Sequence, residues 1–171
     1  SYEKKKLSKG VLFLSFILFV VAIRSFIGKI VVIEFETSLG VFIGIALATT
    51  LGKALGSVAA KYLGCKRTIL VSMVIAIVCL CLGNRNPYTL CLGIMMFNFS
   101  MPITLYYANH ISKGKEGFAF GALAAALIPG YLFGMLEYTI LSAKLCIVIF
   151  SVFSAGIICL LDRGVKEYGA L

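Results

Sequence analysis

Three basic residues, Arg24, Lys29 and Lys53, lie within long apolar segments of the sequence. No acidic residue occurs between positions 4 and 33 or between positions 37 and 115, so the neighbouring sequence offers these cations no carboxylate. A charged side chain near the centre of a membrane costs several kcal/mol unless it is paired or faces a water-filled cavity. Because Arg24 lies near the middle of its segment, we expect it to line an internal cavity. The alternative is a structural ion pair with a carboxylate of another chain.

Lys29 and Lys53 lie nearer the ends of their segments, and two interpretations stay open for them. Long basic side chains can extend to the membrane surface, so Lys29 can reach toward Glu34 or Glu36 and Lys53 toward the inner lipid headgroups. In the other interpretation the two lysines face a cavity, and on this basis Lys53 is a candidate residue of a substrate pathway.

A group of polar residues occurs in the fourth long apolar segment. Asn98, Pro102 and Tyr106 follow one another at intervals of four and share one face of a helix. Pro102 lacks a backbone N–H and therefore frees a carbonyl of the preceding turn. The hydroxyls of Ser100 and Thr104 can bond their own helix, so the amide of Asn98 is the better candidate for contact with a solute.

Residues that support catalysis or bind metals are few and scattered. The single histidine, His110, has no acid at ligand spacing, and we expect it at the membrane interface. The six cysteines form no Cys-x-x-Cys pair, and five lie in apolar runs, where free cysteine is usually buried. A metal site needs clustered thiolates or imidazoles, and nucleophile elbows and phosphate-binding loops are absent. The sequence predicts neither an enzyme nor a metal or cofactor site.

The composition indicates the environment of these residues. Of the 171 residues, 61% are apolar and 13% are charged, whereas about 25% are charged in an ordinary soluble domain. A crossing helix needs about 20 apolar residues, and a backbone in lipid must satisfy its own hydrogen bonds. The sequence therefore predicts one all-α integral membrane domain over residues 1–171. Its six transmembrane helices are expected at 11–33, 39–60, 68–83, 88–109, 117–136 and 140–161.

The charges of the connecting segments predict the orientation of this bundle. With six spans, eleven of the 16 Lys and Arg residues fall on one side, and only Arg85 and Lys144 fall on the other. This asymmetry is typical of the positive-inside rule and predicts two cytoplasmic termini in a plasma-membrane protein. The basic N-terminus is similar to a signal peptide, but the apolar stretch continues past Arg24 without a cleavage site. We attribute the net charge of +9 to orientation rather than to nucleic-acid binding.

The connection between the second and third segments carries a recognisable motif. Residues 56–67 have the sequence GSVAAKYLGCKR, in which a turn glycine, Gly64, precedes the basic pair Lys66 and Arg67. This pattern resembles the cytoplasmic signature loop of the major facilitator superfamily, roughly G-x-x-x-D-R-x-G-R-R. Lys61 and Tyr62 stand where that family has its acid and its arginine. The departure removes an acid that helps to latch one conformation in that family.

The fifth segment adds a partial match to the antiporter motif of the same superfamily. Gly121, Gly130 and Gly134 have its G-x8-G-x3-G spacing, although the proline expected after the last glycine is absent. Glycines at such spacing also occur where membrane helices simply pack closely. The step from Arg24 to Ser25 is similar to the seventh helix of some bacterial efflux members, which favours likeness to the C-terminal half.

The resemblance implies a fold and a site. Each half of such a transporter is a six-helix bundle built from two inverted three-helix repeats, which would be residues 11–82 and 88–161 here. The first and fourth helices of each half line the central pathway. The resemblance therefore implies that Arg24 and Asn98 face this pathway. Tyr106, on the helix face of Asn98, and Lys53, as an intramembrane cation, are the other candidate residues of the pathway.

Three functions stay open from the sequence. The first is a half or subunit of a secondary active transporter that moves a small solute, anionic or zwitterionic, by alternating access. It requires a second six-helix bundle, which is another chain, a copy of this one or a missing part of the same polypeptide. The second is a six-helix substrate-binding membrane subunit of an ATP-driven uptake transporter. The third is a purely structural membrane subunit. The expected partners include the lipid bilayer and exclude nucleic acid.

Overall fold

The computed structural model describes residues 2–34, 39–82, 86–112, 115–135, 148–149 and 151–160. No strand occurs among these residues, which confirms the prediction of an all-helical chain for this part of the protein. A short apolar helix, Ser151–Leu160, follows the six longer elements. These six are α1 (Tyr2–Glu34), α2 (Leu39–Leu63), α3 (Cys65–Leu82), α4 (Pro87–Asn98), α5 (Ser100–Ser112) and α6 (Glu116–Met135).

The first helix is longer than the sequence predicts. It begins at Tyr2 rather than at residue 11 and ends at Glu34. The N-terminal run contains lysine and leucine, which are good helix formers, and no proline. The helix therefore continues from the apolar segment into the basic one. Its apolar part, Gly10–Lys29, is long enough to cross a membrane.

A single residue, Gly64, separates α2 from α3. Its backbone has a φ of +83°, in the left-handed region that favours glycine. The Gly64 N–H donates to the Ala60 carbonyl at 3.1 Å, which closes the C-terminus of α2 in an αL motif. The Gly64 carbonyl accepts from both the backbone N–H of Thr68 and its hydroxyl, at 3.1 and 2.9 Å. One glycine thus ends one helix and starts the next.

The predicted span 88–109 is divided into two helices, which corrects the expectation of one continuous helix. Asn86 caps α4 by accepting from the Tyr88 N–H at 3.0 Å, and Pro87 occupies the first turn. The interruption lies at Phe99, whose N–H donates to the Met96 carbonyl at 3.2 Å. Pro102 explains the break, because it has no N–H for the carbonyl four residues earlier.

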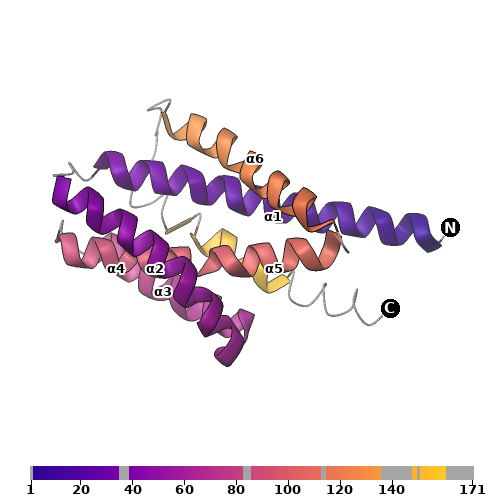
Figure 1. Cartoon of the computed structure of the whole chain (residues 1–171), viewed down its shortest axis with the longest axis horizontal. Coiled ribbons are helices and arrows are strands. Elements are labelled where there is room, and N and C mark those ends of the chain that lie inside the picture. Colours follow the sequence, from indigo (N-terminus) through magenta and orange to yellow (C-terminus); the bar gives the residue numbers. More distant parts are fainter. Residues whose placement is uncertain are drawn as a thin grey trace.

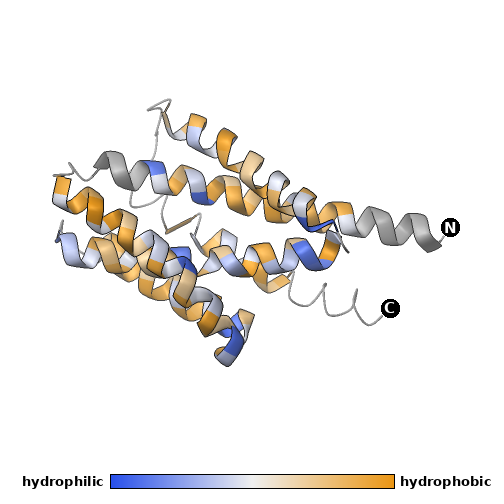
Figure 2. Ribbon diagram, in the orientation of Figure 1, coloured by the Kyte–Doolittle hydropathy of each residue, from blue (hydrophilic) through white to orange (hydrophobic). Residues whose placement is uncertain are grey.

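Within the part of the chain that the structure describes, four segments are long and apolar enough to cross a membrane: Gly10–Lys29, Leu39–Leu63, Pro87–Ser112 and Glu116–Met135. Hydrophobic colour covers most of the helical surface in Figure 2, and hydrophilic residues gather at the α2–α3 turn. The third helix has 18 residues and starts with a basic pair. Of the sixth predicted span, 140–161, only residues 148–149 and 151–160 are described. Membrane character is therefore shown, whereas the count of six spans stays a prediction.

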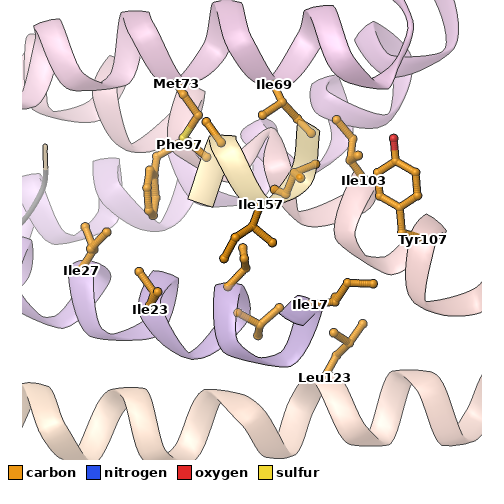
Figure 3. Close-up of a cluster of buried hydrophobic side chains, with 14 of the residues drawn as sticks. Ile17, Ile23, Ile27, Ile69, Met73, Phe97, Ile103, Tyr107, Leu123 and Ile157 are labelled. Carbon is orange, nitrogen blue, oxygen red and sulfur yellow. The ribbon is translucent and has the colours of Figure 1, made fainter. Parts of the chain in front are cut away.

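The helices form two groups (Figure 1). α6 packs chiefly on α1, and α4 packs on both α2 and α3, while α5 contacts members of both groups. Buried apolar side chains join the groups, and Figure 3 shows Ile157 of the last helix between α1 on one side and α3 on the other. Large apolar side chains such as Phe42, Leu47 and Leu51 of α2 are exposed. Such a surface is suited to lipid or to another apolar bundle.

Candidate functional site

Arg24 is a buried cation at the middle of the bundle. It lies on α1, is only 8% exposed, and its Nη1 atom is buried without a hydrogen-bond partner. A buried donor that makes no hydrogen bond raises the free energy of the folded state, and it does so more when it belongs to a charged group than to a neutral one. The neighbouring sequence supplies no acid, since Asp and Glu are absent between positions 4 and 33. Among the residues that the structure describes, Nη1 is therefore a buried donor without a partner, which an anion would satisfy.

A cavity of about 250 Å³ opens beside this guanidinium. Three of the residues predicted from the sequence to form a substrate pathway line it together: Arg24 from α1, Lys53 from α2 and Asn98 from α4. Residues from all six helices contribute to its wall, including Leu80 of α3, Met101 of α5 and Leu127 of α6. The structure thus brings together polar residues that are up to 74 positions apart in the sequence.

Two glycines on α2 place Lys53 and Asn98 at the same cavity. A side chain at Gly52 would collide with the Met95 carbonyl and would come within 3.0 Å of Cβ of Asn98. At Gly56 it would come within 2.7 Å of Cα of Phe99. The two helices can therefore approach until their backbones touch, as small residues allow in membrane proteins. Lys53, which follows Gly52 directly, lines the cavity from α2 and is itself exposed.

Two glycines on α6 make the corresponding contact with α1. A side chain at Gly130 would collide with the Ala22 carbonyl and would come within 3.0 Å of Cβ of Ser25. At Gly134 it would come within 2.9 Å of Cβ of Lys29. Ser25, the neighbour of Arg24, also donates its hydroxyl to the Leu127 carbonyl at 2.8 Å. The segment of α1 that carries Arg24 is thereby held against α6.

Asn98 presents only part of its amide to the cavity. Its Nδ2 donates to the Ile94 carbonyl of its own helix at 2.9 Å. This bond uses one of the two Nδ2 hydrogens, which leaves the other hydrogen and Oδ1 for a solute or water. The acceptor oxygen complements the donors of Arg24 and Lys53, so the cavity offers both kinds of hydrogen-bonding group.

Lys29 and Tyr106, which the sequence also singles out, lie away from this cavity lining. The Lys29 ammonium lies 5.0 Å from the centroid of the Tyr131 ring, which is a cation–π contact. Tyr106 is 57% exposed and stacks on His110, with ring centroids 6.2 Å apart. It lines a different cavity of about 400 Å³ together with Lys61. Tyr106 is therefore not grouped with Arg24 and Asn98.

The motif at the α2–α3 connection forms a tight basic turn. Gly64 supplies the left-handed backbone conformation, and Lys66 and Arg67 are exposed in the first turn of α3. Lys61 and Tyr62, at the positions of the acid and the arginine in the resembled motif, are exposed too. The turn concentrates positive charge at one end of α2 and α3.

Sequence reasoning missed a second cavity of about 280 Å³ on the α5–α6 side of Arg24. Its α6 residues are Phe120, Leu123, Ala124 and Leu127. Their spacing of i, i+3, i+4 and i+7 is the pattern of one helix face, so a search for faces rather than for polar residues could have found them. Arg24 and Lys53 line this cavity as well.

Comparisons with protein-family models, with curated proteins and with solved structures find no match to this chain.

Proposed function

We propose that this chain is a six-helix half of a secondary active transporter related to the major facilitator superfamily, and that it binds an anionic or zwitterionic solute at Arg24. One observation carries the proposal. A buried guanidinium without a hydrogen-bond partner for Nη1 lines a cavity that also contains Lys53 and Asn98. An intramembrane ionisable residue that faces a cavity is a common feature of solute pathways.

The helix packing supports a fold of two inverted repeats. Gly52 of α2 contacts Met95 and Asn98, three positions apart, and Gly130 of α6 contacts Ala22 and Ser25, also three positions apart. The other glycine of each helix makes a corresponding contact. Gly56 of α2 lies near the Phe99 carbonyl, and Gly134 of α6 lies near the Phe26 carbonyl.

These contacts relate α1 to the α4–α5 span by a constant offset of 73 positions, and α2 to α6 by an offset of 78. The second helix of each three-helix unit thus packs on the first helix of the other unit, α6 on α1 and α2 on the α4–α5 span. This exchange is expected of inverted repeats. In the proposed fold the span formed by α4 and α5 is the counterpart of α1, which makes Arg24 and Asn98 residues of equivalent helices.

A second bundle completes the proposed transporter. Alternating access moves one bundle against another around a central site, and Arg24 and Lys53 line cavities that open at the side of this chain. The second bundle is another chain, a copy of this one or a further part of the same polypeptide.

The test is the effect of Arg24 variants on solute binding, which does not require the second bundle. Vesicles reconstituted with the full chain are incubated with a panel of radiolabelled phosphate, dicarboxylates, sulfonates and amino acids, and the bound solute is measured. We expect Arg24→Gln to weaken binding at least tenfold at matched insertion. Arg24→Lys restores only part of it, because lysine keeps the charge but loses the planar fork that binds a carboxylate or phosphate.

Lys115→Gln is the matched control, since it removes a charge from the exposed start of α6. Normal binding by Arg24→Gln would show that the arginine is structural and would overturn the proposal. Wild-type vesicles that bind none of these solutes would overturn it as well.

A further inference from the structure

The two cavities beside Arg24 share a wall. Arg24, Lys53, Met101 and Leu127 line both of them. The cations therefore lie at the junction of the two spaces rather than at the end of either one. A ligand bound to the guanidinium has access to both cavities at once.

The two cavities differ in chemistry. The first adds the amide of Asn98 and the hydroxyl of Thr49 to the two cations. The second, beyond the same cations, is lined by apolar side chains and by Thr104, whose hydroxyl is donated to the Met101 carbonyl at 2.8 Å. Its additional residues are Val21, Pro102, Leu105, Phe120, Leu123 and Ala124. A cavity that carries several polar groups and a more uniformly apolar one thus meet at a pair of cations.

The α6 wall of the apolar cavity contains one buried residue and two exposed ones. Leu123 is buried, and Figure 3 shows it directed from α6 toward α1. Phe120, one turn away, lines the same cavity and is 63% exposed. Ala124 is a small, exposed lining residue, so a larger side chain at this position would take up space in the cavity.

We propose that the ligand is an amphipathic anion, with its carboxylate or similar anionic group at Arg24 and Lys53 and a short apolar tail in the second cavity. The inference rests on the proposed anion site and adds the class of ligand. A compact anion such as phosphate would pair with the cations and leave the apolar cavity unused. Because each cavity is near the lower limit of small-molecule pockets, about 300 Å³, the tail is short.

The expected signature is a gain in affinity with tail length. Burial of one methylene group is worth about a fourfold change in binding constant. Linear carboxylates from acetate to hexanoate should therefore stabilise the full chain at progressively lower concentrations. Binding is measured by thermal unfolding in detergent with a thiol-reactive dye, which the cysteines of the chain make possible.

Three variants separate the head from the tail. Arg24→Gln should weaken acetate and hexanoate alike, by at least tenfold, and should leave the weak binding of neutral hexanol unchanged. Ala124→Phe should remove the advantage of hexanoate over acetate and leave acetate binding intact. Ala125→Phe is the matched control, because Ala125 is an exposed neighbour that lines neither cavity, and it should retain the advantage.

The outcomes are distinct. Equal affinities for acetate and hexanoate, both dependent on Arg24, would overturn the amphipathic ligand and leave the proposed anion site standing. Retention of the hexanoate advantage by Ala124→Phe as well as by Ala125→Phe would assign the gain to the detergent phase and would also overturn the inference. Purified protein that retains an anionic lipid through Arg24 would make a lipid the occupant instead of a free solute. Binding of no anion at all would overturn the proposed function itself.

Discussion

Two helix pairs carry glycine contacts of the same kind, but polar bonding differs between them. In the α1–α6 pair, Gly130 and Gly134 approach α1, and the Ser25 hydroxyl crosses to the Leu127 carbonyl at 2.8 Å. In the α2–α4 pair, Gly52 and Gly56 approach the backbone just as closely. There, the polar side chains near the contact bond their own helices.

These intrahelical bonds are specific. Thr50 donates to the Ala46 carbonyl at 2.9 Å, Ser57 donates to the Ala54 carbonyl at 2.7 Å, and Asn98 donates to the Ile94 carbonyl at 2.9 Å. The α2–α4 contact consequently rests on fit between backbones, whereas the α1–α6 contact combines fit with a hydrogen bond between helices. Since lipid gives no net hydrophobic force between helices, fit and polar contacts are what hold each pair together.

The difference bears on Arg24. Its neighbour Ser25 belongs to the pair that carries the cross-helix hydrogen bond, while Lys53 and Asn98 belong to the pair in which the bonds of Thr50, Ser57 and Asn98 stay within single helices. We infer that Arg24 is the fixed element of the site and that Lys53 is the element that adjusts when a ligand enters.

The largest effect is expected from Gly130→Ala. The new methyl group would collide with the Ala22 carbonyl, and overpacking of this kind costs about 1–3 kcal/mol. The displacement would also lengthen the Ser25 hydrogen bond, so Gly130→Ala should destabilise the protein more than Gly52→Ala does.

The measurement is the midpoint of thermal unfolding. Gly121→Ala, in open space on the same helix, should be neutral or stabilising. Equal losses at Gly130 and Gly52 would remove the distinction between the pairs.

Gly52→Ala should act mainly on binding. The methyl group would push α2 away from Met95 and Asn98, which separates Lys53 from the rest of the cavity. We expect the apparent Kd for acetate to rise about tenfold, equivalent to about 1.4 kcal/mol. Gly40→Ala, on the same helix with nothing within 4 Å, provides the control. An unchanged Kd in Gly52→Ala would show that the position of α2 does not matter to the site.

The smallest effect is expected from Ser25→Ala. Hydrogen bonds between membrane helices average about 0.6 kcal/mol, and we expect a loss of that size in the free energy of unfolding. Ser57→Ala, which removes an exposed bond within one helix, should change it by less. In the Gly130→Ala background the effect of Ser25→Ala should shrink, because the two sites share one contact. A loss from Ser57→Ala as large as that from Ser25→Ala would contradict the comparison.

Local features of the sequence were sufficient to predict the helices and several of their ends. The apolar runs predict helices because a backbone in lipid must bond within its own segment. Gly64 and the Asn86–Pro87 step mark their turns through φ and capping preferences that depend on a few neighbouring residues. The burial of Arg24 follows from its place in an apolar run without a nearby acid.

Local features were less informative about where a helix is interrupted. Pro102 leaves a carbonyl of the preceding turn without its helical N–H partner, but this alone does not predict that the span 88–109 breaks at Phe99. A proline in a membrane helix can be accommodated by a bend or by a break, and the neighbours decide between them. Here Gly56 places the backbone of α2 against Phe99 itself.

The sequence by itself determined that this protein is helical, rich in apolar residues and provided with cations inside its apolar segments. Only the tertiary structure decided that Lys53 and Asn98 join Arg24, that Tyr106 does not, and that an apolar cavity adjoins the cations. The physical reason lies in the range of the interactions. Hydrogen bonding within a helix and the length of an apolar run are local properties of the sequence. Cavities form between helix faces, and which faces pack together depends on glycines that fit against the backbone of a helix distant in sequence.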